Sequence, residues 1–324
     1  MKIVFMGTPD FARKSLEKIY EQGHEIQLVI TNPDKPKGRG MKLFYSPVKE
    51  FALEKELKIS QPVKIRESIE EIKQLNPDII VVVAYGKIIP NEILEIPRLG
   101  AVNVHGSLLP KYRGAAPIQW AIINGEKVTG VTTMYINEKM DAGDMLLKKE
   151  LEIGENDTLG EVWQKLSEIG ADLLVETLKR IENGTIERIP QTGEPTYAPL
   201  LNKEIAKIKW ESMSAVHIKD LIRGLNPIMG AYSYLNGDKI KFWKAKTLTV
   251  DDFVNKVNEF EEFKSRLFKL EPGTIIYSDE KYGLFIKTKD EVLEIEELQV
   301  PNSRKMNVKE FLRGNCLQAG MIFE

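Results

Sequence analysis

Apolar and polar positions follow three successive patterns at the start of the chain. Residues 2–6 contain a short apolar run, residues 10–21 carry apolar side chains at helical spacing, and residues 25–30 return to an extended pattern. Two strands that are joined through a helix form a right-handed crossover and lie parallel in one sheet. The start of the chain therefore predicts a parallel α/β sheet.

The same patterns continue beyond this first unit. Residues 78–84 are a continuous apolar run rich in β-branched side chains, which is typical of a central strand covered on both faces. Two more strands and two helices are predicted at residues 101–104, 130–136, 115–123 and 158–182. Residues 1–187 are therefore expected to form a catalytic domain of the doubly wound, Rossmann-like α/β class with a parallel sheet.

The pattern changes in the second half of the chain. Residues 188–207 are rich in Pro, Gly and Thr and lack a helical period, so we predict a linker there. In residues 208–324, Asn236-Gly237 is a strong hairpin signal between two strand patterns. One helix is predicted at residues 214–224, and strands are predicted at residues 231–235, 239–248, 273–277, 283–288 and 292–299. This pattern predicts a small β-barrel domain of the five-stranded, oligonucleotide-binding type.

Composition narrows the class of protein. The chain has 324 residues, of which 42% are hydrophobic and 29% charged, as in an ordinary globular protein of roughly two domains. No apolar run approaches the ~20 residues that cross a bilayer, and the first apolar run is too short for a signal peptide. Cys316 is the only cysteine, so no intramolecular disulfide can form. A cytoplasmic location is therefore expected.

Two classes of cofactor are not expected. The turn after the first strand has one glycine, Gly7, followed by Pro9, where a dinucleotide-binding protein would carry G-x-G-x-x-G. The three histidines, His24, His105 and His217, are far apart in the sequence and do not have the spacing of zinc ligands. Neither nicotinamide binding nor a zinc site is therefore predicted.

Asn103, His105 and Asp141 are the strongest chemical signal in the chain. Asn103 and His105 are separated by one residue at the end of a predicted strand, so their side chains point to the same side. That end is the carboxyl edge of the sheet, where open α/β sheets bind their ligands. Asp141 lies in a Met-Asp-Ala-Gly-Asp turn after a later strand, and Asp144 of the same turn is the rival carboxylate.

These side-chain types suit an acyl-transfer reaction, although a lone histidine at a strand end is more often a packing or capping residue. A carboxamide can stabilise an oxyanion, an imidazole can move protons near neutral pH, and a carboxylate can keep the imidazole protonated and oriented. No Ser or Cys lies in a nucleophile elbow. Direct transfer to an external nucleophile is therefore favoured over a covalent enzyme intermediate.

Residues 31–43 are a second informative segment, because they follow the second predicted strand. In a parallel sheet this segment lies at the same edge as His105. Its four bases, against the single acid Asp34, are Lys35, Lys37, Arg39 and Lys42. Such a segment suits the phosphate backbone of a nucleic acid near a catalytic pocket, whereas a solvated loop is the simpler alternative.

Charge is distributed unevenly over the C-terminal half. Between residues 203 and 249, nine Lys and Arg residues outnumber four Asp and Glu residues, whereas fifteen acids outnumber eleven bases from residue 250 onwards. A polyanion would therefore meet a basic patch rather than a uniformly basic protein. A solvated charged face remains the alternative.

Four motifs together give the chain a family resemblance. They are NVHGSLLPKYRGAAPIQWAI from residue 103, GTPDFA from residue 7, VVVAYGKIIP at residues 81–90 and MDAGDM at residues 140–145. With them the chain resembles the methionyl-tRNA formyltransferase family over essentially its whole length. The resemblance implies a translation-initiation enzyme with 10-formyltetrahydrofolate as formyl donor, no metal, and the α-amino group of methionine on initiator tRNA as acceptor.

The resemblance also implies roles for individual residues. It assigns catalysis to Asn103, His105 and Asp141. The folate-binding residues that it implies are Ser107, Leu108, Leu109, Pro110, Tyr85, Gly86 and Ile88. It assigns tRNA binding to the basic segment at residues 31–43, with Arg39 as the main contact, and to the C-terminal barrel. A monomer is expected, because the active site must accommodate a bulky substrate.

Two alternatives remain open at this point. A formyltransferase of the same catalytic fold could act on a small amine, such as glycinamide ribonucleotide or an amino sugar, although the basic segment and the additional C-terminal domain count against it. A non-catalytic tRNA-binding module is the other alternative. Such a module would have no use for Asn103, His105 and Asp141.

Overall fold

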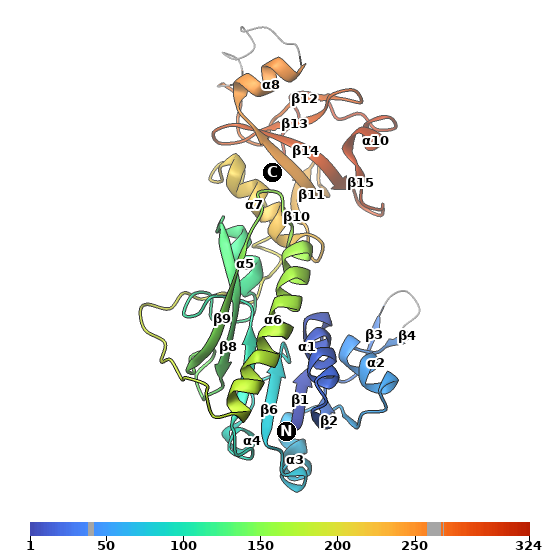
Figure 1. The fold of residues 1–324 in the computed structure, drawn as a ribbon. Helices are drawn as coiled ribbons and strands as arrows, with labels where there is room; N and C mark the ends of the chain where they lie inside the picture. Colours follow the sequence, from blue (N-terminus) through green and yellow to red (C-terminus); the bar gives the residue numbers. More distant parts are fainter. Residues whose placement is uncertain (38–41, 258–266, 268) are drawn as a thin grey trace. The chain divides into compact units, whose positions relative to one another are not determined.

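The computed structural model describes residues 1–37, 42–257, 267 and 269–324 (Figure 1). It divides into two compact units. The first unit consists of Met1–Ile118, Lys127–Ile153 and Glu161–Leu200, and the second consists of Gln119–Glu126, Gly154–Gly160 and Leu201–Glu324. Two short segments from the first half of the chain thus belong to the second unit, which the sequence pattern did not indicate.

A seven-stranded sheet forms the centre of the first unit, in the order β5-β2-β1-β6-β7-β8-β9. Its strands are β1 (Lys2–Gly7), β2 (Glu25–Ile30), β5 (Ile59–Ser60), β6 (Ile79–Val83), β7 (Ala101–His105), β8 (Val128–Tyr135) and β9 (Met145–Glu152). The first five strands of this order pair in parallel. The predicted Rossmann-like sheet is therefore confirmed, and all five residues of its central strand β6 are buried, as the apolar run indicated.

The last two strands correct the prediction of a wholly parallel sheet. β8 pairs antiparallel with β7, and β9 pairs antiparallel with β8. The turn between β8 and β9 is short, and a short turn can join only antiparallel neighbours. The sequence pattern did not predict β9, because this strand lies at the edge of the sheet and exposes the charged run Lys148-Lys149-Glu150.

Helices cover both faces of this sheet (Figure 1). On one face, α1 buries Phe11 and Leu16, and α6 approaches so closely at Gly170 that a Cβ there would meet the side chain of Val104 at 3.1 Å. On the other face, Ile72 packs against the strands. The helices of this part of the chain are α1 (Asp10–Glu21), α2 (Pro47–Glu54), η1 (Ile65–Ser68), α3 (Ile69–Leu75), α4 (Asn91–Leu94), α5 (Pro117–Ile123) and α6 (Leu159–Glu182).

The basic segment after β2 contains a short hairpin rather than only a loop. β3 (Lys35–Lys37) pairs antiparallel with β4 (Lys42–Phe44). Arg39 lies outside the described residues. Because β2 and β7 run in the same direction in one sheet, the segments that follow them leave from the same carboxyl edge.

The second unit is built on an antiparallel sheet, as predicted. Its strand order is β10-β11-β14-β13-β12, with β15 paired to β14. Asn236 and Gly237 have φ angles of 51° and 83°, which are typical of the hairpin turn predicted there. The elements are α7 (Ala215–Leu225), β10 (Ala231–Leu235), β11 (Asp238–Leu248), α8 (Val250–Val257), β12 (Ile275–Asp279), β13 (Gly283–Lys287), β14 (Val292–Gln299), β15 (Met306–Asn307) and α10 (Val308–Leu312).

The C-terminal residues connect the two edge strands of this sheet. Phe323 N–H donates to the carbonyl of Gly273, just before β12, at 2.9 Å. Glu324 N–H donates to the carbonyl of Tyr234, in β10, at 2.9 Å. The ring of Phe323 also packs against Phe242 in the core. The chain end therefore links β12 to β10, as a barrel requires.

Each helix within the described ranges is too short or too polar to cross a membrane. The same ranges hold no cluster of three or more His, Cys, Asp or Glu side chains that are placed to bind a metal ion.

Candidate active site

The carboxyl end of β7 carries Asn103 and His105, two of the three predicted catalytic residues. β7 lies between β6 and β8, and Asn103 is in register with Val82 on one side and Met134 on the other. His105 is the last residue of β7 and is only 5% exposed. Since β7 is paired on both sides, both polar side chains project from a well-supported strand.

His105 directs its two ring nitrogens at different loops. Nε2 lies 2.9 Å from the carbonyl oxygen of Tyr112. A carbonyl oxygen can only accept, so Nε2 carries a proton and donates it. Nδ1 lies 3.7 Å from Oδ2 of Asp141, which is too long for a hydrogen bond but within the range of an ion pair. Among the described residues, Nδ1 is thus the nitrogen that has no hydrogen bond.

Asp141 reaches His105 from the turn between β8 and β9. Its Oδ2 atom accepts a hydrogen bond of 2.8 Å from the backbone N–H of Gly114, in the loop that follows β7. The backbone of Asp141 has a φ angle of 48°, a left-handed conformation that is uncommon for a residue with a side chain. A partly buried carboxylate therefore faces a buried imidazole from a defined turn.

Asp144, the rival carboxylate, makes a different contact. Its Oδ2 atom accepts a hydrogen bond of 3.0 Å from Nε of Arg188. The guanidinium of Arg188 also lies over the ring of Tyr135, 4.6 Å from its centroid. The structure therefore pairs Asp144 with Arg188 and places Asp141 beside His105.

Asn103 has unused hydrogen-bonding capacity. The residue is partly buried, and no described residue hydrogen-bonds to its carboxamide. A carboxamide offers two donors and a carbonyl acceptor, and side chains in the interior normally have such groups paired. The unpaired carboxamide is therefore available to a bound molecule.

The loop after His105, which the resemblance assigns to folate, is fixed through its backbone. Thr132 Oγ1 donates to the carbonyl of Ser107 at 2.7 Å and accepts from Leu109 N–H at 3.1 Å. Lys148 Nζ donates to the carbonyl of Leu109 at 2.5 Å. Sequence reasoning missed Thr132 and Lys148, although Thr132 stands opposite His105 in the pairing of β7 with β8.

The second predicted folate segment follows β6 and includes Tyr85. Tyr85 is 2% exposed, and its hydroxyl has no hydrogen-bond partner among the described residues. Burial raises the pKa of Tyr85 to about 12. Asn32 Nδ2 donates to the Tyr85 carbonyl and to Thr8 Oγ1, each at 3.0 Å, so it connects three loops.

The seven predicted folate residues differ in exposure. Ser107, Leu109 and Tyr85 are buried, Leu108 and Pro110 are partly exposed, and Gly86 and Ile88 are exposed.

The base of the basic hairpin is anchored to the first unit. The predicted tRNA contacts Lys35, Lys37 and Lys42 lie on β3 and β4. Just before β3, the carboxylate of Asp34 pairs with the ammonium of Lys49 and accepts a hydrogen bond of 2.9 Å from Gln61 Nε2. Burial raises the pKa of Asp34, but these two partners outweigh it and hold the pKa below its usual value.

Residues 189–198, which fall inside the predicted linker, hydrogen-bond to the loops of the site. Ile189 and Met145 exchange two backbone hydrogen bonds of 2.8 and 2.9 Å. Tyr112 N–H donates to Thr196 Oγ1 at 2.8 Å, and the side chain of Gln191 reaches the turn of Asp141. Sequence reasoning missed these contacts, because a composition rich in Pro, Gly and Thr indicates the absence of a helix but not the absence of tertiary hydrogen bonds.

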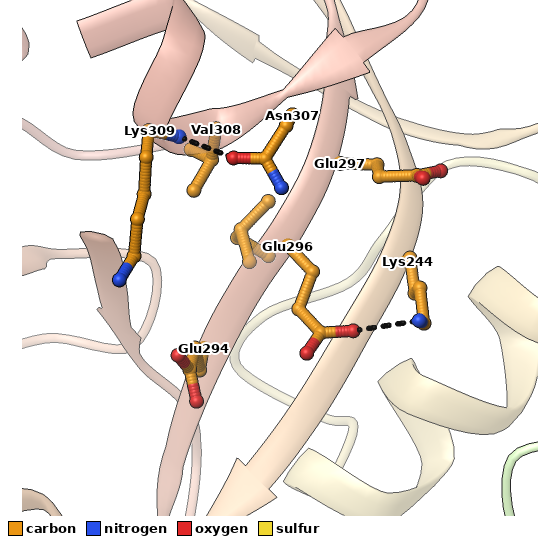
Figure 2. Close-up of a pocket in the computed structure, with 8 residues that line it drawn as sticks. Lys244, Glu294, Glu296, Glu297, Asn307, Val308 and Lys309 are labelled. Carbon is orange, nitrogen blue, oxygen red and sulfur yellow. Dashed lines mark hydrogen bonds and ion pairs between the residues drawn. The ribbon is translucent and has the colours of Figure 1, made fainter. Parts of the chain in front are cut away.

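A cavity of about 250 Å³ lies in the second unit, beside β14 and the start of α10 (Figure 2). None of the predicted catalytic or folate-binding residues lines it, although it lies in the C-terminal domain and includes Lys244 of the basic region at residues 203–249. Its lining residues are Lys244, Glu294, Ile295, Glu296, Glu297, Asn307, Val308 and Lys309. The chemistry at the end of β7, rather than this hollow, therefore defines the candidate active site.

Two family models match the chain, one for each part. The model described as formyl transferase matches residues 1–178, and the model described as formyl transferase, C-terminal domain, matches residues 200–316. The methionyl-tRNA formyltransferase of Clostridioides difficile (strain 630) is 51% identical over 325 residues and covers 99% of each chain. That of Clostridium perfringens (strain SM101 / Type A) is 48% identical over 328 residues and covers 100% of each chain.

Solved structures share the fold at lower identity. An N-formyltransferase from Helicobacter canadensis, in complex with folinic acid and dTDP-3-aminofucose, has a TM-score of 0.65 at 22% identity and covers 91% of this chain and 99% of its own. HypX from Aquifex aeolicus, in complex with tetrahydrofolic acid, has a TM-score of 0.65 at 18% identity. The alignment covers 96% of this chain and 47% of HypX. At these identities the likeness shows the fold alone.

Proposed function

Because the chain belongs to the methionyl-tRNA formyltransferase family, we propose that it transfers the formyl group of 10-formyltetrahydrofolate to the α-amino group of methionine on initiator tRNA. The observation that carries this proposal is the contact between His105 and Asp141, together with the unpaired carboxamide of Asn103, which lies two positions before His105 on β7. The proposal includes a monomeric enzyme in the cytoplasm, where charged tRNA is used.

Asn103 is the proposed oxyanion donor. When the amine nitrogen of the acceptor bonds to the formyl carbon, negative charge moves to the formyl oxygen. The Asn103 amide can donate to that oxygen without giving up a hydrogen bond that the resting protein makes. Donors that are already oriented stabilise a developing charge at little cost in reorganisation.

His105 is the proposed proton donor. Its Nε2 atom is committed to Tyr112, so Nδ1 is the nitrogen that serves the substrates. Nδ1 first accepts the proton that the amine loses as its new bond to the formyl carbon forms. Nδ1 then delivers this proton to the folate nitrogen as the bond between that nitrogen and the formyl carbon breaks. Asp141 faces Nδ1 with a negative charge, and Gly114 N–H keeps the carboxylate in this direction.

The basic hairpin is the proposed contact with the tRNA backbone. It follows β2 and therefore leaves the sheet at the edge where His105 lies. The contacts that we assign are Lys35, Lys37, Arg39 and Lys42. Replacement of Arg39 by Ala should raise KM or lower kcat for charged tRNA and leave KM for the formyl donor unchanged. Unchanged tRNA kinetics would remove the hairpin from the binding site.

The test of the function is a comparison of acceptors. The enzyme is given 10-formyltetrahydrofolate with methionyl initiator tRNA, with glycinamide ribonucleotide or with an amino-sugar nucleotide, and the formylated amine is identified. We expect methionyl-tRNA to be the productive acceptor. Formylation of a small amine with a comparable kcat/KM would replace this proposal by the small-amine alternative.

A His105→Ala variant tests the assigned chemistry. Its turnover should be abolished, while the melting temperature and the binding of the formyl donor persist, because the imidazole is needed for proton transfer. Near-normal formyl transfer by the folded variant would remove His105 from the mechanism.

A further inference from the structure

Gln191 uses all of the hydrogen-bonding positions of its side chain within the first unit. Nε2 donates to the carbonyl of Asp141 at 2.9 Å and to the carbonyl of Gly143 at 2.8 Å. Oε1 accepts from Nε and Nη2 of Arg113 at 3.0 and 2.7 Å. An amide has two N–H donors and two lone pairs on its oxygen, so no capacity remains. These four bonds hold the amide in a single orientation.

The four bonds join the two backbone segments that support the imidazole and the carboxylate. Arg113 lies between Tyr112, whose carbonyl accepts from His105, and Gly114, whose N–H donates to Asp141. The amide at position 191 holds the side chain of Arg113 on one side and the backbone of Asp141 on the other. A relative shift of the two segments must therefore break at least one of these bonds.

Both segments have backbone conformations that need support from outside. The φ angle is 59° at Tyr112 and 48° at Asp141. This left-handed conformation costs about 1 kcal/mol or more for a residue with a side chain. Gly114 has a φ angle of 124°, and a Cβ there would lie 2.6 Å from the carbonyl oxygen of Ala198. Neither segment would be expected to hold this shape alone.

The segment that carries Gln191 is itself fixed at both ends. On one side, Ile189 exchanges two backbone hydrogen bonds with Met145, at the start of β9. On the other side, Arg113 N–H donates to the carbonyl of Thr196 at 2.8 Å, and Ala198 N–H donates to the carbonyl of Arg113 at 2.7 Å. The amide therefore acts from a fixed frame.

We propose that Gln191 is a positioning residue for formyl transfer, which sets the place of Asp141 relative to His105 through Arg113. This inference rests on the roles that we proposed for His105 and Asp141. The amide contacts backbone carbonyls and a guanidinium that are not part of the assigned chemistry. Its loss should therefore act on the rate of the chemical step and not on the affinity for either substrate.

Replacement of Gln191 by Met is the first test, because Met has a similar length and no hydrogen-bonding amide. We expect kcat to fall about 10- to 100-fold, since small misplacements of reacting groups have effects of this order. KM for 10-formyltetrahydrofolate and for methionyl-tRNA should stay within about threefold. Gln191→Glu keeps the acceptor for Arg113 but replaces the N–H donor by a carboxylate oxygen that faces the carbonyls of Asp141 and Gly143. Oxygen would then repel oxygen, so kcat should fall at least as far.

A double-mutant cycle separates positioning from a general structural role. If Gln191 acts through Asp141, Gln191→Met should lower kcat by less than about threefold in an Asp141→Asn background. Equal losses in both backgrounds would overturn the proposal. The matched control is Arg188→Gln, which breaks an exposed ion pair of the same segment with Asp144 and should leave kcat within about twofold.

The outcomes distinguish this proposal from the proposed site. Unchanged kcat in folded Gln191→Met and Gln191→Glu variants overturns the positioning role alone. Unchanged kcat in Asp141→Asn overturns the assigned site itself. If thermal melting shows that the Met variant does not fold, Gln191→Glu and Arg113→Lys provide the same test, because Arg113→Lys loses the two-pronged contact and keeps the charge.

Discussion

The end of β7 and the cavity beside β14 differ in how their polar side chains are satisfied. Around the cavity, Lys244 pairs with Glu296 at 3.2 Å (Figure 2), and Lys256 pairs with Glu294 at 2.7 Å. At the end of β7, the carboxamide of Asn103 has no hydrogen bond to any described residue. One region neutralises its charges internally, and the other keeps a polar group unpaired.

The pairing of polar side chains is a better guide to function here than the size of a cavity. Exposed or partly exposed ion pairs contribute modestly to stability and leave little hydrogen-bonding capacity for a ligand. Polar groups that are fixed on a paired strand, with capacity unused, are prepared to meet charge that develops in a reaction. The carboxylates that line the cavity of about 250 Å³, Glu294, Glu296 and Glu297, are each held in an ion pair, whereas the end of β7 holds a polar group with unused capacity.

The largest effect should come from Asn103→Ala. We expect kcat to fall about 10²- to 10³-fold, which corresponds to about 3–4 kcal/mol of transition-state stabilisation, because an oxyanion donor is lost. The free energy of unfolding should change little, since the carboxamide makes no hydrogen bond within the described structure. Steady-state kinetics and denaturant unfolding measure the two quantities. A loss of stability with normal kcat would mean that Asn103 is a structural residue.

A smaller effect should separate the two carboxylates of the β8–β9 turn. Asp141→Asn should lower kcat about 10- to 100-fold, because Nδ1 of His105 loses the negative charge that faces it. Asp144→Asn breaks only the ion pair with Arg188 and should leave kcat within about threefold. If kcat falls further for Asp144→Asn than for Asp141→Asn, the assigned pair is wrong.

The sequence pattern predicted the parallel part of the fold well because burial there is regular along the chain. β6 is apolar throughout and lies at the centre of the sheet, so a continuous run was sufficient evidence. β9 is an edge strand with exposed charges, and its pattern does not differ from that of a loop. β8 pairs antiparallel with both β7 and β9, and an apolar pattern predicts a strand without its direction.

The candidate site was predictable only where its residues share a strand or a motif. Asn103 and His105 lie two positions apart on β7, and the spacing alone places them on one side. The choice between Asp141 and Asp144 depends on Gly114 and Arg188, which are distant in sequence. Gln191 lies further away still, in a segment whose composition is that of a linker. Such tertiary hydrogen bonds have no periodic signal in the sequence.

A third test addresses the charged region around the cavity. Glu294 is 7% exposed and accepts from Lys256 at 2.7 Å on both carboxylate oxygens. Glu294→Gln should lower the free energy of unfolding by about 1–2 kcal/mol, because a charge-assisted pair is lost, and should leave kcat at saturating substrates within about twofold. The matched control is Lys305→Gln, which breaks the more exposed pair with Glu297 and should cost less than about 1 kcal/mol. A large loss of kcat in Glu294→Gln would contradict the division between the two regions.

A Tyr85→Phe variant tests whether an unpaired polar atom in the first unit always belongs to a ligand-binding site. The hydroxyl of Tyr85 is buried in an apolar cluster, so Tyr85→Phe should change the free energy of unfolding at pH 7 by less than about 1 kcal/mol.

The pKa of Tyr85 is about 12 in the folded protein against 10.0 in its ordinary state. Its favourable contribution is therefore complete below pH 10 and is lost as the pH rises towards 12, because the unfolded chain ionises first. Between pH 7 and pH 11 the wild type should therefore lose about 1 kcal/mol more of its free energy of unfolding than the Phe variant loses. Denaturant unfolding of both proteins at both pH values measures this difference. Equal pH dependence of the two proteins would show that the Tyr85 hydroxyl is accessible to solvent and available to a ligand.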